Sequence, residues 1–116
     1  MDDLYQRYQA GERNFSQIDL HDADLSGLDL SGADFTTANL KGANLSQTNL
    51  SQTNLNGTIL QNANLSQANL SEANLSLADL GFANLTEANL TGANMQMAIL
   101  FRTRFKNTTM PDGTIR

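Results

Sequence analysis

The fold is decided by the stretch ANLSQTNLSQTNLNGTIL, residues 43–60. A large apolar side chain returns at every fifth position of this stretch, at Leu45, Leu50, Leu55 and Leu60. Five residues turn an α-helix through about 500°, so a helix would scatter these leucines around its circumference. In a flat strand the odd spacing would send successive leucines to opposite faces. The period therefore fits neither regular structure and indicates a chain that bends after every unit.

The same period extends in both directions from this stretch. Two residues before each large apolar residue stands a small one, usually Ala and sometimes Thr, and the residue between them is Asn or Asp in most units. Self-similarity of this kind, sustained without an insertion, indicates a solenoid. The twenty central residues are Phe15, Leu20, Leu25, Leu30, Phe35, Leu40, Leu45, Leu50, Leu55, Leu60, Leu65, Leu70, Leu75, Leu80, Leu85, Leu90, Met95, Leu100, Phe105 and Met110.

A bend of a quarter circle per unit satisfies this pattern. Each large residue, and the small one two before it, then points to a common axis, and four units close one coil of twenty residues. Coils stacked at roughly 4.8 Å pair their backbone N–H and C=O groups as a parallel ladder. We therefore predict an all-β solenoid of about five coils.

Single units carry a family resemblance. They include Ala23-Asp24-Leu25-Ser26-Gly27, Ala43-Asn44-Leu45-Ser46-Gln47 and Ala93-Asn94-Met95-Gln96-Met97. These units resemble the A(D/N)LXX repeat of pentapeptide-repeat proteins, and the match runs from about Arg13 to Asp112. The resemblance implies a right-handed quadrilateral parallel β-helix. It implies little about function: most members have none assigned, and a minority resemble DNA and inhibit type II topoisomerases.

Both ends of the repeat carry distinct sequences. We expect a single domain with a capping helix over 2–11, repeats over 13–112 and a tail over 113–116. Leu4 and Tyr8 share one face of that helix, which we expect to cover the first coil, and Gly11 is a natural stop. At the other end Met110-Pro111-Asp112-Gly113 is a turn signal that lets the tail fold back. The borders of the repeat are similar to those of cyanobacterial members of the family.

The composition excludes several classes of partner. Twelve acidic against seven basic residues give a net charge of −5, so we expect no direct nucleic-acid binding. The chain has no Cys, which excludes disulfides and thiolate metal sites. The sequence shows neither a secretory signal nor an apolar run long enough for a membrane span, so we expect a cytoplasmic protein without a membrane partner.

The residues offer no recognisable catalytic chemistry. His21 is the one histidine, directly follows a central residue and should lie on the outer surface. Ser and Thr are plentiful, but no nucleophile can be assembled with an activating base, so we expect no enzyme and no cofactor. The equivalent acids of the first coil should point in four directions and hold no metal; they are Asp19, Asp24, Asp29 and Asp34. The Asn side chains in the same slot should be solvated or bonded along their columns.

Departures from the repeat indicate a candidate interaction patch. Positions twenty apart should lie above one another, and outward slots that are normally polar hold apolar residues on or beside one face. The patch comprises Ile59, Leu77, Phe82, Met97, Ile99 and Phe101. Asp79 interrupts it. Such a patch is typical of an interface; alternatively Arg102 covers Phe82 and the tail packs over the rest.

Two functional hypotheses follow. The first is a non-catalytic interaction or scaffold module, either for an unknown protein partner or for self-association. Acids gather in the first coil and bases in the last, which also allows opposite ends to attract. The alternative is a DNA-mimic inhibitor or protector of a type II topoisomerase. The long acidic columns that mimicry requires are lacking, because the middle of the chain offers only Glu72, Asp79 and Glu87.

Overall fold

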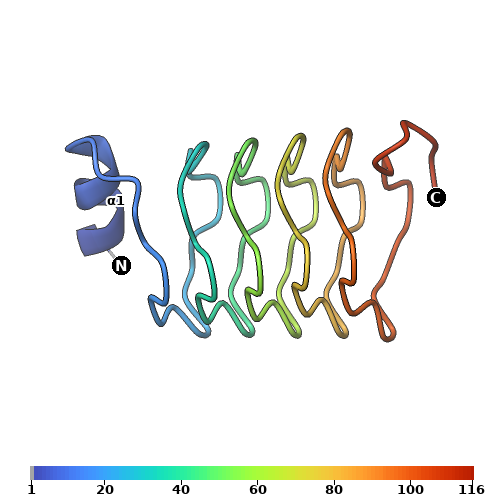
Figure 1. Ribbon diagram of the computed structural model, residues 1–116, viewed down its shortest axis with the longest axis horizontal. Helices are drawn as coiled ribbons and strands as arrows, with labels where there is room; N and C mark the ends of the chain where they lie inside the picture. The colour runs from blue at the N-terminus through green and yellow to red at the C-terminus, as the bar shows by residue number, and fades with distance from the viewer. Residues whose placement is uncertain (1) are drawn as a thin grey trace.

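The computed structural model describes residues 2–116 and is a stack of coils with one short helix at its amino-terminal end (Figure 1). Parallel bridges join residues twenty apart, such as Asn44 to Asn64 and Asn64 to Asn84. Twenty residues therefore make one coil. The molecule measures 36 × 22 × 21 Å, with the stack along its length. The expected right-handed quadrilateral β-helix is confirmed.

Each unit contributes two kinds of backbone hydrogen bond. Between coils, Leu45 N–H donates to Asn64 O at 2.7 Å, and Asn64 N–H donates to Ala43 O at 2.9 Å. Within a coil, Ala43 N–H donates to Leu40 O at 3.1 Å and closes a four-residue turn. Because a turn follows so soon, the rungs among residues 2–116 are single bridges and not longer strands.

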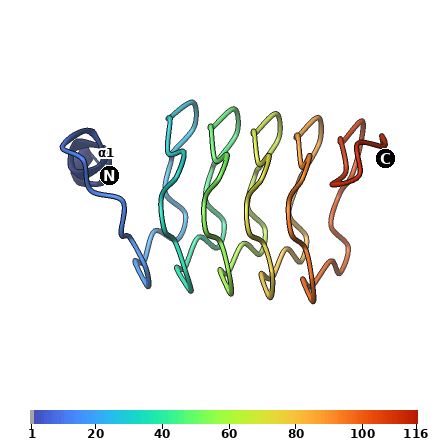
Figure 2. The same cartoon turned by 45° about the horizontal axis from the view of Figure 1, so that its top comes forward.

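The corner of every unit depends on a left-handed residue. The second residue after each central Leu has a positive φ, as at Gln47 (59°) and Gly27 (73°). A four-residue turn with positive φ at its third position is a type II turn. Gly adopts this conformation without strain, whereas other residues adopt it at a cost. Both Gly and polar residues occupy this slot. Because the turn recurs at the same position in successive coils, the corners line up in Figure 2.

The Asn or Asp before each central residue caps the next corner. Asn44 Oδ1 accepts from Ser46 N–H at 3.1 Å and from Ser46 Oγ at 2.7 Å. This N–H is the one backbone donor of the unit that neither the ladder nor the turn uses. We expected these side chains to be solvated or bonded along their columns, and that expectation is corrected. The motif requires Asn or Asp because a short side chain with an oxygen can reach back to its own turn.

The interior is a column of central residues and small residues. The central residues from Leu25 to Leu90 are at most 1 % exposed. Inward Thr residues bury their hydroxyls by bonding to backbone: Thr48 Oγ1 donates to Leu45 O at 2.6 Å. At the amino-terminal end Phe15 stacks on Phe35, with ring centroids 5.7 Å apart. Within the described part of the chain, every buried polar side-chain atom has a hydrogen-bond partner, as a stable interior requires.

Helix α1, Asp2–Gln9, covers the first coil, as predicted. Leu4 is 2 % exposed and belongs to the core cluster, while Tyr8 Oη donates to Ser31 O at 2.7 Å. The helix ends two residues before the predicted limit, because Gly11 N–H already turns back to Tyr8 O at 3.0 Å. No helix within residues 2–116 is long and apolar enough to cross a membrane.

The tail folds back as a small antiparallel hairpin. Gly113 N–H donates to Met110 O at 2.8 Å, and Thr109 pairs with Ile115. The Arg116 guanidinium lies 4.4 Å from the centre of the Phe105 ring. The tail thus covers one side of the last coil and leaves Leu100 on the other side 37 % exposed.

Candidate functional site

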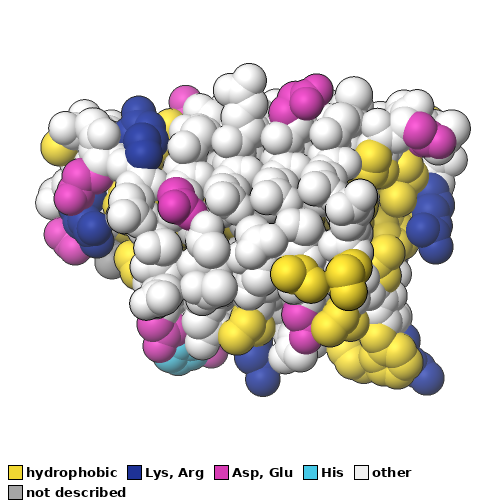
Figure 3. All heavy atoms as spheres, in the orientation of Figure 1, with side chains coloured by type: hydrophobic (Ala, Val, Ile, Leu, Met, Phe, Trp, Pro, Cys, Tyr) yellow, Lys and Arg dark blue, Asp and Glu magenta, His cyan; other side chains and the backbone are white. Residues whose placement is uncertain are grey.

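The structure brings the predicted patch residues together on one side of the stack. Leu77 N–H donates to Gln96 O, which places Leu77 beside Met97. Ile59, Asp79 and Ile99 are bridged in succession, so they form one column. The two aromatic members lie at the next corner in adjacent columns: Phe101 is in register with Gly81, and Phe82 is in register with Arg102. Figure 3 shows these apolar side chains gathered toward the carboxyl-terminal end, while the histidine and several acids lie at the other end of the same side.

The aromatic corner of the patch consists of Phe82 and Phe101. Phe82 N–H donates to Phe101 O at 2.9 Å, and the rings meet edge to face with centroids 5.5 Å apart. Arg102 lies 5.5 Å from the Phe101 ring. In one of the alternatives drawn from the sequence this guanidinium covers Phe82, whereas the structure places it over the Phe101 ring. The geometry leaves Phe82 54 % and Phe101 61 % exposed.

The tail does not cover the patch, contrary to one of the alternatives drawn from the sequence. Met97 is 80 % exposed, and the other five members are between 39 % and 61 % exposed. The tail instead pairs with Thr108 and Thr109 and packs on Phe105, away from the patch residues. The six side chains are therefore open to solvent on one side of the stack.

Two patch residues occupy slots where the repeat needs a capping side chain. Ile59 and Ile99 replace Asn or Asp, so Gln61 N–H and Phe101 N–H have no protein acceptor among the described residues. The other two units without a capping Asn or Asp compensate: Lys106 N–H donates to Thr108 Oγ1 at 3.1 Å, and Pro111 has no N–H to satisfy. Among residues 2–116, the corner N–H therefore lacks an acceptor only in the two units that carry Ile59 and Ile99.

Three further members stand at the left-handed corner slot. Leu77, Phe82 and Met97 have φ angles of 61°, 60° and 59°. A branched or aromatic side chain at positive φ is disfavoured, and Gly or Asn would relieve the strain. Non-Gly residues such as Thr37, Gln47 and Glu72 adopt the same φ at other corners, so the three patch members differ from them by their apolar side chains and not by their backbone.

Asp79 interrupts the patch without leaving a bare charge in it. Its Oδ1 accepts from Gly81 N–H at 3.0 Å, and its Oδ2 accepts from the Gln61 side chain at 2.6 Å. Both oxygens are therefore engaged within the chain. The carboxylate lies between Ile59 and Ile99 and has no cationic partner among the described residues, so its two hydrogen bonds offset only part of the cost of covering it.

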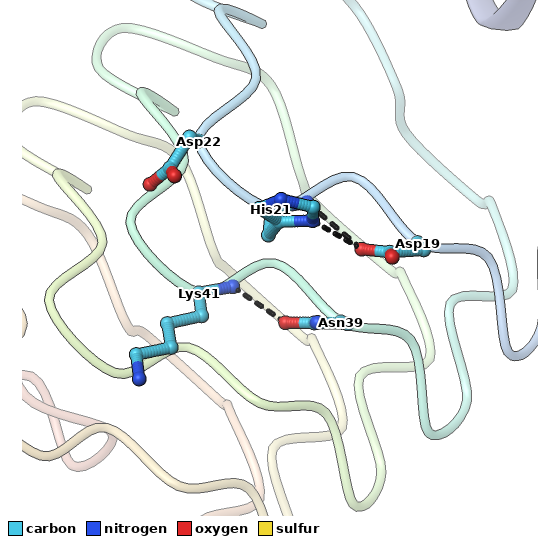
Figure 4. Close-up of a pocket in the computed structure, with 5 residues that line it drawn as sticks. All are labelled: Asp19, His21, Asp22, Asn39 and Lys41. Carbon is cyan, nitrogen blue, oxygen red and sulfur yellow. Dashed lines mark hydrogen bonds and ion pairs between the residues drawn. The ribbon is translucent and has the colours of Figure 1, made fainter.

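A shallow polar pocket lies at the amino-terminal end of the same side (Figure 4). Its lining residues are Asp19, His21, Asp22, Asn39 and Lys41. His21 Nδ1 lies 2.8 Å from Asp19 Oδ1, and the hydrogen bond between the two side chains raises the pKa of His21 and lowers that of Asp19. The sequence analysis did not predict this cluster, although the twenty-residue register places Lys41 beside His21.

The other acids of the first coil are engaged in their own turns. The side-chain hydrogen bond from Ser26 lowers the pKa of Asp24, and the backbone N–H of Ser31 has the same effect on Asp29. Within residues 2–116, no three side chains of His, Asp or Glu gather as a metal site would require. These carboxylates serve as caps.

Comparison with known proteins gives the same family from sequence and from structure. The family model described as pentapeptide repeats matches residues 14–52, 38–76 and 68–107. A search among curated proteins found no match. The chain is 36 % identical to alr5209, a pentapeptide repeat protein from Nostoc PCC 7120, with a TM-score of 0.55, and the match covers 90 % of this chain and 93 % of that one.

Two further solved structures are similar over most of their length. The Arabidopsis thaliana thylakoid lumen protein AT2G44920 is 33 % identical with a TM-score of 0.46, covering 84 % of this chain and 71 % of that one. HetL from Nostoc sp. PCC 7120, described as involved in heterocyst differentiation regulation, is 20 % identical with a TM-score of 0.49, covering 100 % and 99 %. With its twenty units, its match to the family model and its 36 % identity to alr5209, the chain belongs to the pentapeptide-repeat family.

Proposed function

We propose that this protein is a non-catalytic interaction module that binds another protein surface through the patch formed by Ile59, Leu77, Phe82, Met97, Ile99 and Phe101. The β-helix acts as a scaffold that holds the patch residues of successive coils in register. Contiguous exposed apolar surface of this kind is typical of protein interfaces.

The observation that carries the proposal is that exposed apolar side chains gather where the repeat otherwise places polar residues or Gly. Ile59 and Ile99 forfeit the corner cap, and Leu77, Phe82 and Met97 fill a corner slot that elsewhere holds only polar residues or Gly. Residues that break the local rules of a fold tend to mark functional sites, because the fold alone gives no reason to keep them. All five lie on one surface, beside Phe101.

The polar groups support a binding role and not a catalytic one. The one histidine pairs with Asp19 in an open, exposed pocket. A nucleophile needs a neighbouring base and a group that orients that base. The hydroxyls of the serines before each corner instead bond to the capping Asn or Asp, as Ser46 does to Asn44. We therefore assign the surface, and not a side-chain constellation, as the site.

Affinity capture from a lysate of the source organism tests the proposal. The bait is the wild type, the double variant Phe101→Ser with Met97→Ser, or a control, Gln47→Ser with Gln67→Ser, which changes an exposed column on another face. We expect one protein to be retained by the wild type and the control and lost by the patch variant. Equal retention by all three baits would overturn the assignment of the patch.

We do not favour the topoisomerase-directed alternative. Mimicry of DNA requires columns of negative charge, whereas the column that ends in the patch residue Phe101 holds His21, Lys41, Gln61 and Gly81 before it. In a gyrase supercoiling assay we expect neither inhibition nor protection.

A further inference from the structure

We propose that the last coil offers a second binding surface, the open backbone edge beside Arg102, Arg104 and Lys106, to which an extended acidic segment of another protein adds as a β-strand. This inference goes beyond the proposed function. The edge lies on the side of the stack that follows the side of Ile59 and Ile99, and its use does not depend on the patch. Strand addition combines backbone hydrogen bonds, which give affinity, with side-chain contacts, which give specificity.

The backbone of this side ends without a partner. One coil earlier, Leu85 N–H donates to Arg104 O and Arg104 N–H donates to Ala83 O, both at 2.8 Å. In the last coil, Phe105 N–H has no protein acceptor and Thr103 O has no protein donor within the described part of the chain. Unpaired groups in this arrangement are a template for an incoming strand.

The tail shows how a segment pairs with the last coil. Thr108 N–H donates to Arg116 O at 3.1 Å, and Arg116 N–H donates to Thr108 O at 2.8 Å. Ile115 is bridged to Thr109 and is 65 % exposed, as expected for a strand in which alternate residues point outward. This pairing closes the neighbouring side of the coil and stops at Thr108, so the side of Arg104 stays open.

Three basic side chains lie along the open edge. Arg102, Arg104 and Lys106 alternate along the chain and are exposed, and none of them forms an ion pair among the described residues. Residues 102–116 hold four basic residues and one acidic residue, whereas residues 1–101 hold three and eleven. Figure 3 shows basic side chains at this end of the molecule. The charge of this end is thus opposite to that of the rest of the chain, and it favours an anionic partner.

Arg104 occupies the slot in which the repeat otherwise places the capping Asn or Asp. The corner does not need a cap from this slot, because Lys106 N–H donates to Thr108 Oγ1 at 3.1 Å. The guanidinium is therefore available to a carboxylate, with which it can form two parallel hydrogen bonds. The unpaired N–H and C=O groups favour a polypeptide over a nucleic acid, which offers no strand to pair.

The geometry of the edge specifies the pattern of the segment. In an added strand, the residue beside Arg104 points outward and its two neighbours point toward the axis of the stack, as Thr103 and Phe105 do. Acidic residues in the outward positions then face the three bases, and apolar residues in the inward positions cover Phe105. The probe is therefore the peptide acetyl-Glu-Val-Glu-Val-Glu-Val-amide.

The first experiment measures binding of the labelled probe by fluorescence anisotropy. We expect saturable binding to the wild type that weakens as salt is added, since exposed charges are screened. Arg104→Asn, which also restores the residue usual in this slot, should raise the dissociation constant at least about fivefold. Lys41→Ser removes the same charge from another coil and should bind as the wild type does. No saturation up to about 1 mM probe, or equal binding by Arg104→Asn, overturns the proposal.

The second experiment tests strand addition itself. Amide exchange measured by NMR should slow at Phe105 N–H when the probe binds, and should not change at Leu85 N–H, which is already bonded. A probe methylated on its backbone nitrogens keeps its charge but cannot pair, so we expect it not to bind. Equal binding by the methylated probe, or binding that leaves Phe105 unprotected, overturns the added strand. A thymidine hexanucleotide that displaces the probe as well as unlabelled probe does overturns the choice of a polypeptide.

Discussion

At the scale of single residues, the hydrogen bond made by the capping Asn or Asp explains the repeat better than the secondary-structure propensities of its residues do. Each unit has five backbone positions, and the side-chain oxygen satisfies the one N–H that the ladder and the turn leave over, as Asn64 does for Ser66 at 3.0 Å. The Asn slot is therefore a hydrogen-bonding requirement of the corner, and its loss has a definite cost.

Two substitutions in this slot should change stability in opposite directions. Asn64→Ala removes the acceptor for Ser66 N–H and Oγ and should lower the free energy of unfolding by about 1–2 kcal/mol. Ile59→Asn supplies an acceptor for Gln61 N–H and should raise it by about 0.5–1.5 kcal/mol. Urea denaturation measures both. If Ile59→Asn destabilised the protein as Asn64→Ala does, the capping argument would fail.

The His21–Asp19 pair should titrate as a unit. The hydrogen bond between them raises the pKa of His21 and lowers the pKa of Asp19. The contribution of His21 to stability is present below its ordinary pKa and is lost as pH rises through the raised value; that of Asp19 is lost as pH falls through its lowered value. The pair is therefore most favourable in the acidic to neutral window between the two.

An NMR titration of the His21 ring measures this effect. We expect its pKa above the ordinary value in the wild type and a return toward that value in Asp19→Asn. Asp22→Asn is the control, because Asp22 acts on His21 only through its charge and should produce a smaller decrease. An unchanged His21 pKa in Asp19→Asn would refute the pairing.

At the scale of elements, α1 closes the amino-terminal end of the stack. Leu4 is the residue by which the helix joins the core, and Arg7 lies 5.0 Å from the Phe15 ring beneath it. Open coil ends expose strand edges that associate with other chains. The helix thus provides both burial for Phe15 and protection against end-to-end contact.

Leu4→Asp should detach the helix. Burying a carboxylate in place of a leucine should cost about 2–4 kcal/mol and expose the first coil. We expect a lower melting temperature and larger species in light scattering. Gln6→Asp makes the same charge change on the exposed side of α1 and should alter neither quantity. A monodisperse, equally stable Leu4→Asp would contradict the capping role.

The sequence was sufficient for the coils and the cap because both follow from spacing. The five-residue period sets the quarter turn, and the Leu4 to Tyr8 spacing sets the helix face. The role of Asn44 could not be predicted in this way, because its bond to Ser46 depends on the backbone angles of the corner. The register predicted the neighbours within the patch and their outward positions, but whether the tail covers them was not readable from it, because the tail lies outside the repeat.

At the scale of the whole molecule, the register is the property that function depends on. Each unit occupies one face, so removing five residues rotates everything beyond the deletion by a quarter turn, and removing twenty leaves all faces aligned. Solenoid stability is nearly a sum over repeats and their neighbours, so both deletions should fold.

These two deletions test whether binding needs the patch residues to be aligned on one side, and not only to be present. Deleting 83–87 retains all six patch residues but moves Met97, Ile99 and Phe101 to a face adjacent to that of Leu77. Deleting 36–55 removes a whole coil and keeps the columns intact. By circular dichroism we expect a β-helix in both chains. By affinity capture we expect the partner of the patch to associate only with the second. If the chain lacking 83–87 associated as the wild type does, the aligned columns would not be the binding surface, because its apolar residues are the same and only their common face has been lost.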